Sequence, residues 1–102
     1  MGHYYQQGDV LMFPTEIPMG AKKDIETGIL AVGDVTGHAH RIKNKKTAIL
    51  FLIGTTMYLR ALQKTEIIHE EHDLIPLPQG DYRIDFVREY DHFREEARRA
   101  TD

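Results

Sequence analysis

The chain contains no cysteine among its 102 residues. This absence excludes a disulfide scaffold, an iron–sulfur site, a zinc site with thiolate ligands and a cysteine nucleophile. A chain without cysteine fits a reducing compartment, and we therefore expect a cytoplasmic protein. Its chemistry has to be sought in other side chains.

Long apolar runs are also absent. The longest run, Ala48–Ile53, has six residues, whereas a membrane-spanning helix needs about 20. The first nine residues have neither the basic nor the apolar region of a signal peptide. The sequence also lacks a glycine-rich phosphate loop and a nucleophilic serine elbow. These absences predict a soluble protein without a membrane partner.

The charge is weak and unevenly distributed. The net charge is −3; residues 1–62 carry +2, from seven basic and five acidic side chains, and residues 63–102 carry −5, from six and eleven. Nucleic-acid-binding domains are usually basic, so we do not expect a nucleic-acid partner. The basic turn Lys43–Lys46 is interpreted as a solvated loop tip, with a phosphate contact as the alternative.

The composition predicts one globular, mostly β domain over residues 1–102. Hydrophobic residues make up 41% of the chain, and a chain of about 100 residues has room for one core. Short apolar or alternating runs are bounded by turn residues, which favours a small β-barrel or β-sandwich. We expect extended segments at residues 10–13, 29–32, 35–42, 47–53, 57–62, 66–69 and 82–86, with a loop at 15–24.

A short C-terminal helix is predicted at about residues 91–100. Asp91 is a suitable N-cap, and Phe93, Ala97 and Ala100 fall on one helical face. At the other end of the chain, Tyr4 and Tyr5 indicate an edge strand or a subunit contact. A homo-oligomer is therefore one expected state.

Two histidines, His38 and His40, form the first cluster that could carry chemistry. On a strand, residues two apart point to the same face, so these imidazoles could share a metal ion. Neutral imidazole suits zinc, nickel, copper or iron. Gly37 lets the backbone bend sharply just before the pair.

The second cluster is the run from His69 to His72, with Glu70 and Glu71 between the histidines. On a helical turn both imidazoles would share a face, and on a strand they would face opposite ways. In either case a carboxylate lies beside each imidazole. It could ligate a metal, orient an imidazole or act as a general base.

Two functional hypotheses follow from these clusters. In the first, the protein binds one divalent transition metal such as zinc, nickel, iron or manganese, and hydrolyses a small substrate. The metal ligands would be His38, His40 and one of His69 or His72, which leaves a position for water, and Glu70 or Glu71 would take a proton from that water. In the second, the same residues form a polar network without metal in a non-enzymatic binding or accessory module. The sequence leaves both open, and with them the question of whether the protein is an enzyme.

A smaller prediction concerns Arg88 and Tyr90. These two residues follow a predicted strand and could bind a small polar or anionic ligand at the rim of a pocket. The alternative is an ion pair with Glu89 and a tyrosine packed at the junction with the helix.

The two histidine clusters belong to a longer signature. The chain resembles a small family of uncharacterised bacterial proteins, and this resemblance covers most of residues 6–92. It implies that the histidine clusters and the Arg88–Tyr90 run belong together, but it implies no activity. The segments that carry it are Gln7–Leu11, Leu30–His40, His69–His72, Ile75–Tyr82 and Arg88–Tyr90.

A weaker resemblance is to cupins, which are small β-barrels with a histidine-bound metal. Gly33 followed by His38 and His40 is similar to the first cupin motif, and Pro78-x-Gly80 to the second. The glutamate of the first motif is missing, and Arg83 stands in place of the second motif's histidine. The resemblance implies a barrel-like architecture but not a cupin metal centre.

Overall fold

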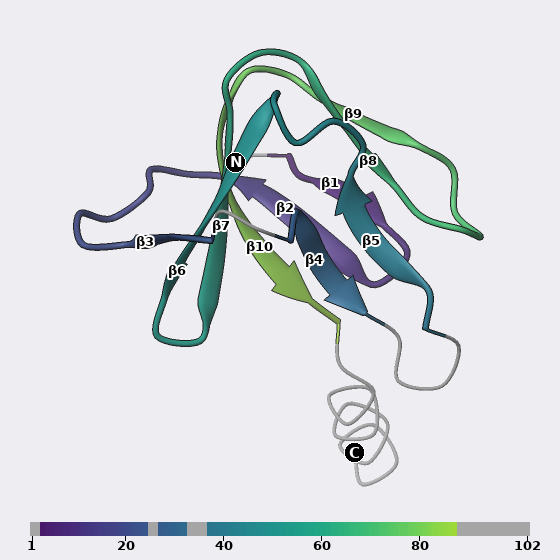
Figure 1. The fold of residues 1–102 in the computed structure, drawn as a ribbon, viewed down its shortest axis with the longest axis horizontal. Helices are drawn as coiled ribbons and strands as arrows, with labels where there is room; N and C mark the ends of the chain where they lie inside the picture. The colour runs from purple at the N-terminus through teal and green to yellow at the C-terminus, as the bar shows by residue number, and fades with distance from the viewer. Residues whose placement is uncertain (1–2, 25–26, 33–36, 88–102) are drawn as a thin grey trace, which may run out of the picture.

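The computed structural model describes residues 3–24, 27–32 and 37–87. Within these ranges the chain is mostly β, as the sequence predicts, and forms ten strands in two antiparallel sheets (Figure 1). The predicted helix at 91–100 and the predicted ligand-binding residues Arg88 and Tyr90 lie outside the described residues.

The larger sheet has six strands in the order β1-β2-β10-β7-β6-β3. Its middle is built from β10, β7 and β6, which pair over most of their length. A tight hairpin joins β6 to β7 at Gly54, whose positive φ of 60° suits glycine. The strands are β1 (Tyr5–Gln7), β2 (Val10–Pro14), β3 (Lys22–Asp24), β6 (Ala48–Ile53), β7 (Thr56–Ala61) and β10 (Gly80–Phe86).

The smaller sheet has four strands in the order β4-β5-β8-β9. They are β4 (Ile29–Val32), β5 (Ala39–Ile42), β8 (Thr65–Ile68) and β9 (Ile75–Leu77). Pro76 is accommodated in β9 because that strand lies at the sheet edge, where a missing N–H donor is tolerated.

The core lies between the two sheets. Alternation along β10 buries Tyr82 and Ile84, and alternation along β7 buries Leu59 and Ala61, as the sequence pattern predicts. The smaller sheet supplies the opposing layer. One hydrophobic cluster therefore joins both sheets, and its buried members are Val10, Met12, Leu30, Ile42, Ala48, Leu50, Leu59, Ala61, Ile67, Leu77, Tyr82 and Ile84.

The prediction of a continuous loop at residues 15–24 is wrong at its end. Residues Lys22–Asp24 form β3 and pair with Leu50–Leu52 of β6. Backbone pairing does not require apolar side chains, and a short charged strand is a common cover for the edge of a sheet. The lysines that suggested a loop are therefore edge-strand residues.

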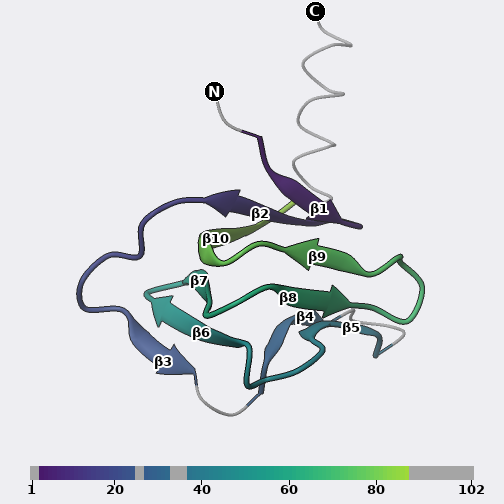
Figure 2. The same cartoon turned by 90° about the horizontal axis from the view of Figure 1, so that it is seen from above.

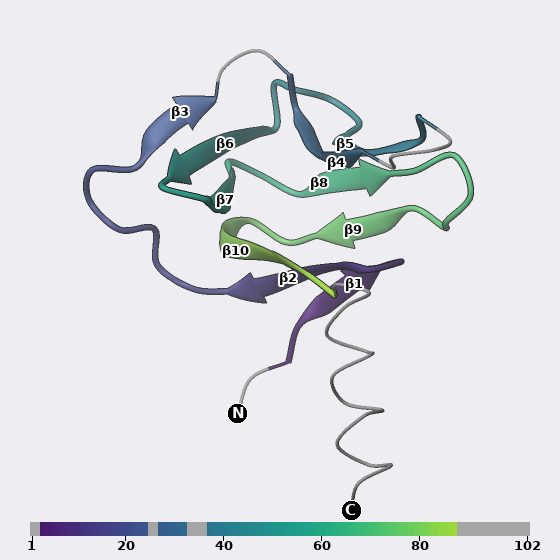
Figure 3. The ribbon, with the colours of Figure 1, turned by 90° about the horizontal axis from the view of Figure 1, so that it is seen from below.

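The two sheets meet along two margins, as Figures 2 and 3 show from opposite sides. At one margin β1 lies beside β9 without pairing to it; we call this the closed seam. At the other, residues of β3 and β6 line one hollow together with Gly28, which precedes β4, and Ile42, which ends β5; we call this the open seam. Since the described strands form two separate ladders, they do not make a closed barrel.

Candidate functional site

Four histidines that are up to 34 residues apart in the sequence gather at the closed seam. The ring centroids of His40 and His69 are 4.2 Å apart, those of His69 and His72 are 4.7 Å apart, and those of His38 and His69 are 5.7 Å apart. The rings of His40 and His72 are stacked, with centroids at 5.8 Å and planes inclined by 16°. The two clusters seen in the sequence thus form a single site, which we call the histidine cluster.

The register of the smaller sheet explains this convergence. In the antiparallel pair of β5 and β8, Arg41 lies opposite Ile68, so the next position brings His40 beside His69. His69 and His72 belong to the bend between β8 and β9, not to a helix or a strand. The backbone between these two histidines is an irregular turn, and this turn brings their imidazoles together.

The hairpin between β1 and β2 supplies the other wall. Gly8 has a φ of 58°, and a Cβ atom at this position would lie 2.6 Å from His72 Nε2. Glycine is required here both for the left-handed backbone and for the room that the imidazole takes. The hairpin also carries Gln7 and Asp9 to the histidine cluster.

His40 is the most deeply buried of the four histidines, with 5% of its surface exposed. Its Nδ1 is 2.8 Å from Gln7 Oε1, and its Nε2 is 3.8 Å from Asp9 Oδ1. Burial lowers the pKa of His40, and the nearby His69 lowers it further, while Asp9 opposes the shift. His40 is therefore neutral at physiological pH.

Glu70 is held by two donors on β5. Its Oε1 accepts a hydrogen bond from the Ala39 amide at 2.9 Å, and its Oε2 accepts one from the Arg41 guanidinium at 2.6 Å. The Ala39 amide, with contributions from the Glu70 backbone and from Arg41, lowers the pKa of the Glu70 carboxyl. Glu70 is thus a stabilised anion at the mouth of the site.

Glu71 makes two different contacts in the same turn. Its backbone amide donates to His69 Nδ1 at 3.0 Å, and its carboxylate Oε1 lies 3.5 Å from His38 Nδ1. The Glu71 side chain is exposed, with 67% of its surface open to solvent. Its carboxylate is therefore open to solvent, whereas that of Glu70 is held by hydrogen bonds.

Three of these residues have the arrangement of a metal-ligand set. One ligand atom each from His38, His69 and Glu70 lies within 4.8 Å of the others. Two imidazoles and a carboxylate are donors that zinc, iron and manganese accept. The set joins one residue of the first sequence cluster to two of the second.

The four histidines and both glutamates are recognisable from the sequence, whereas the roles of Gln7 and Asp9 are not. Gln7 is only 2% exposed, and its side-chain amide donates to the carbonyls of Ile67 and Asp73 at 2.8 and 2.9 Å. Nothing in the sequence distinguishes it from the exposed Gln6. The one available signal was their position ahead of the Gly8–Asp9 turn.

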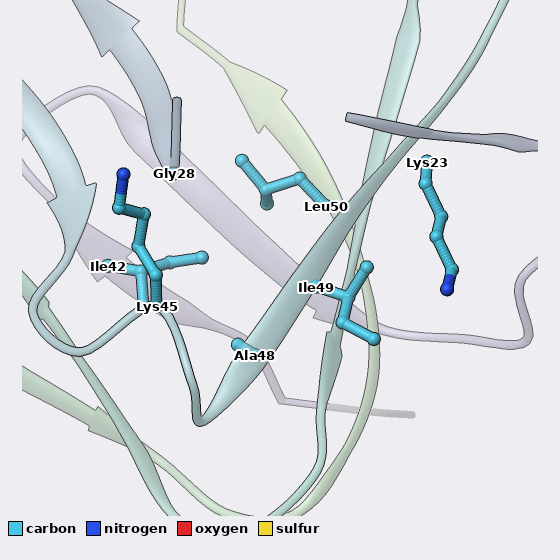
Figure 4. A pocket seen from close by; sticks show the side chains of 7 residues that line it. All are labelled: Lys23, Gly28, Ile42, Lys45, Ala48, Ile49 and Leu50. Atoms are coloured by element: carbon cyan, nitrogen blue, oxygen red, sulfur yellow. The ribbon is translucent and has the colours of Figure 1, made fainter. Parts of the chain in front are cut away.

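A separate hollow lies at the open seam, away from the histidines. It has a volume of about 140 Å³, and its floor is formed by apolar side chains of β5 and β6. Figure 4 shows Lys23 and Lys45 on opposite sides of this floor. The lining residues are Lys23, Gly28, Ile42, Lys45, Ala48, Ile49 and Leu50.

The fold and the site define a class: an antiparallel two-sheet β domain with a histidine-rich cluster where its sheets meet. The chain belongs to a family described as Domain of unknown function (DUF8820), whose profile matches residues 6–86. Neither the curated proteins nor the solved structures give a match. The described part of the chain has no helix with the length and apolarity of a membrane span.

Proposed function

We propose that the histidine cluster is a binding site for a divalent transition metal ion. The observation that carries this proposal is the convergence of His38, His69 and Glu70, whose ligand atoms lie within 4.8 Å of one another. Three protein ligands leave coordination positions for water, as in catalytic zinc sites. Zinc, nickel, iron and manganese are the candidate ions.

Glu70 is suited to be the anionic ligand. A ligating carboxylate has to be deprotonated, and the Ala39 amide and Arg41 already stabilise its charged form. A carboxylate has about four lone-pair directions, so it can keep these hydrogen bonds while it binds a cation. Arg41 would then orient the ligand from behind.

His69 has to rearrange when it binds metal through Nε2. In this structure its Nδ1 accepts the Glu71 amide proton, so the neutral imidazole carries its own proton on Nε2. Ligation through Nε2 would require that proton to move to Nδ1, and His69 would then lose its hydrogen bond with the Glu71 amide. Metal binding is therefore coupled to a change in the turn at residues 69–71.

Hydrolysis of a small substrate is the simplest reaction for such an open site. A bound metal ion would lower the pKa of its water and produce a nucleophile at neutral pH. Glu71 is the better candidate base, because its carboxylate is exposed and free of the amide and guanidinium that stabilise Glu70. The alternative is a polar cluster without metal in a non-enzymatic binding or accessory module.

The test is metal analysis of the untagged protein together with titration of chelator-treated protein with Zn²⁺ and Mn²⁺. We expect at least one tightly bound ion per chain, and a loss of affinity of about 100-fold or more in a His38→Ala/His69→Ala double variant. His3→Ala is the matched control, because His3 is exposed and lies outside the histidine cluster. Absence of binding by the wild-type protein would favour the metal-free alternative.

A hydrolase would need a further result. The metal-loaded protein should cleave small ester, amide or phosphoester substrates, and Glu71→Gln should reduce kcat while it leaves the affinity for metal nearly unchanged. A Glu71→Gln variant with full activity would remove Glu71 as the base.

A further inference from the structure

We infer that His40 Nε2 and Asp9 form a second cation position beside the first, with Gln7 fixing the proton on His40 so that Nε2 is free to bind. The inference rests on the proposed function, since it adds an ion next to the one held by His38, His69 and Glu70. Both Gln7 and Asp9 lie in the Gln7–Leu11 segment of the family signature, but the sequence alone assigned neither of them a role.

The Gln7 side chain has only one satisfactory orientation. Its Nε2 is 2.8 Å from the Ile67 carbonyl and 2.9 Å from the Asp73 carbonyl. Carbonyl oxygens only accept hydrogen bonds, so the nitrogen, with its two protons, has to face them. Rotation of the amide by 180° would place its oxygen against two other oxygens in a buried site, which is strongly unfavourable.

The proton on His40 follows from this orientation. Gln7 Oε1 is an acceptor and lies 2.8 Å from His40 Nδ1, so Nδ1 carries the proton and donates it. The neutral imidazole then has its lone pair on Nε2. A hydrogen bond from one ring nitrogen to a fixed acceptor is how proteins orient histidine ligands of metals.

The lone pair of His40 Nε2 faces the carboxylate of Asp9. The two atoms are 3.8 Å apart, which is too long for a direct hydrogen bond, and both are acceptors when His40 is neutral. Two acceptors at this separation are complementary to a cation between them.

The separation also suits a transition metal. Bonds from zinc to histidine nitrogen and to carboxylate oxygen are both about 2.0–2.2 Å. One ion can therefore bind His40 Nε2 and Asp9 Oδ1 together, because these atoms are 3.8 Å apart. Asp9 is on an exposed turn with 71% of its side chain accessible, which leaves it free to adjust. His72, stacked on His40 and packed against Gly8, is the nearest additional imidazole.

The second position adjoins the first. The rings of His40 and His69 are 4.2 Å apart between centroids, and each ring belongs to a different donor set. Pairs of metal ions about 3.5–4 Å apart act as a clamp on the attacking and leaving oxygens in many hydrolytic enzymes. The second ion would therefore narrow the substrate class to phosphoesters, in which both the attacking and the leaving atom are oxygens.

The test is calorimetric titration of the chelator-treated full chain with Zn²⁺. We expect two equivalents in the wild-type protein and one in Asp9→Asn, with the affinity of the remaining ion within about threefold of the wild-type value. Asp85→Asn is the matched control, because Asp85 is also exposed and faces Arg83 on β10; it should retain two equivalents.

The outcomes separate this inference from the proposed function. One equivalent in both the wild type and Asp9→Asn would overturn the second position and leave the first intact. Two equivalents in Asp9→Asn would also overturn it. No binding in any variant would remove both proposals.

A second measurement tests the role of Gln7 without metal. Nitrogen chemical shifts of the histidine rings should show His40 protonated on Nδ1 in the metal-free wild type, and a mixture of tautomers in Gln7→Met. A wild-type His40 protonated on Nε2 would overturn the assignment, whatever the metal stoichiometry. Circular dichroism of Gln7→Met would verify that the variant is folded before its tautomers are compared.

Discussion

The two seams of this protein close the gap between the sheets in opposite ways. At the closed seam, Gln7 places a buried amide between the sheets and uses three hydrogen bonds to join β1, the turn after β8 and His40. At the open seam, apolar side chains such as Ile42 and Leu50 line a hollow with lysines at its sides (Figure 4).

The difference explains why the candidate chemistry lies at only one seam. Hydrogen bonds are directional, so Gln7 fixes the position and the proton of the imidazole that it touches. Apolar contacts are not directional and tolerate changes of shape. The closed seam can therefore hold ligand atoms in a defined geometry. At the open seam, side chains can be replaced by others of different shape at a smaller cost in stability.

The largest expected effect is at Gln7. Gln7→Leu would leave the Ile67 and Asp73 carbonyls and the His40 Nδ1 proton without their partner in a buried place. We expect a loss of about 3 kcal/mol in the free energy of unfolding, since each unsatisfied buried group costs about 1–3 kcal/mol. Urea denaturation of the metal-free protein measures it, and Gln63→Leu on an exposed bend is the control.

An equal loss in Gln7→Leu and Gln63→Leu would show that the buried amide is not what holds the closed seam together.

The next effect concerns two glycines with nearly the same backbone. Gly8 and Gly54 have φ values of 58° and 60°, but a Cβ would strike His72 only at Gly8 and would meet nothing within 4 Å at Gly54. Alanine at either position should cost about 1–2 kcal/mol of stability for the left-handed conformation. Only Gly8→Ala should also weaken Zn²⁺ binding, because it displaces the His72 ring.

Zn²⁺ titrations compare the affinities of Gly8→Ala and Gly54→Ala, two variants with the same backbone strain. Equal affinities would show that the position of His72 is unimportant for the ion.

A smaller effect of opposite sign is expected at the open seam. Ala48 is buried and lines the hollow, so Ala48→Val adds two methyl groups to a space that can take them. We expect a gain of about 0.5–1 kcal/mol, typical of cavity-filling substitutions, with unchanged metal binding. Thermal denaturation measures the gain, and a loss would mean that the hollow does not accept the added volume.

The smallest effect is a dependence of stability on pH. The pKa of His40 is lowered from its usual 6.5 in the folded protein, so the unfolded chain binds more protons below that value. This contribution to stability is complete above pH 6.5 and is lost as the pH falls toward the folded pKa. Glu70, whose pKa is also lowered, contributes in the same direction only near and below pH 4.5.

Denaturation of metal-free protein between pH 5 and 7 isolates the His40 contribution. The wild type should lose stability on acidification, and His40→Gln should show a flatter profile over the same range. Identical profiles would mean that His40 does not carry this dependence.

Local sequence patterns predicted much of this fold. Alternation identified the buried faces of Met57–Ala61 and Tyr82–Phe86, because inward and outward residues repeat with a period of two. The edge strand β3 was missed because Lys22 and Lys23 carry no apolar pattern. Its pairing depends on the free edge of β6, which is a property of the tertiary structure.

The candidate site was predictable only in part, for the same reason. Imidazoles and carboxylates at short spacings are visible in a sequence, and the structure brings His38, His40, His69 and His72 together. Their meeting depends on the register of β5 and β8. The buried role of Gln7 depends on where the first hairpin lies against the second sheet, which no local pattern records.

The hydrogen bonds of Gln7 also limit when the closed seam can form during synthesis of the chain. Its hydrogen bond to the Asp73 carbonyl spans 66 residues, and at a synthesis rate of about 5–20 residues per second those residues take roughly 3–13 s to appear. Strand β1 is made early but has no partner for its amide until the turn after β8 has left the ribosome. During that interval a metal ion bound as proposed would lack its ligands from that turn, so we expect binding only after residues 69–72 have folded against β5.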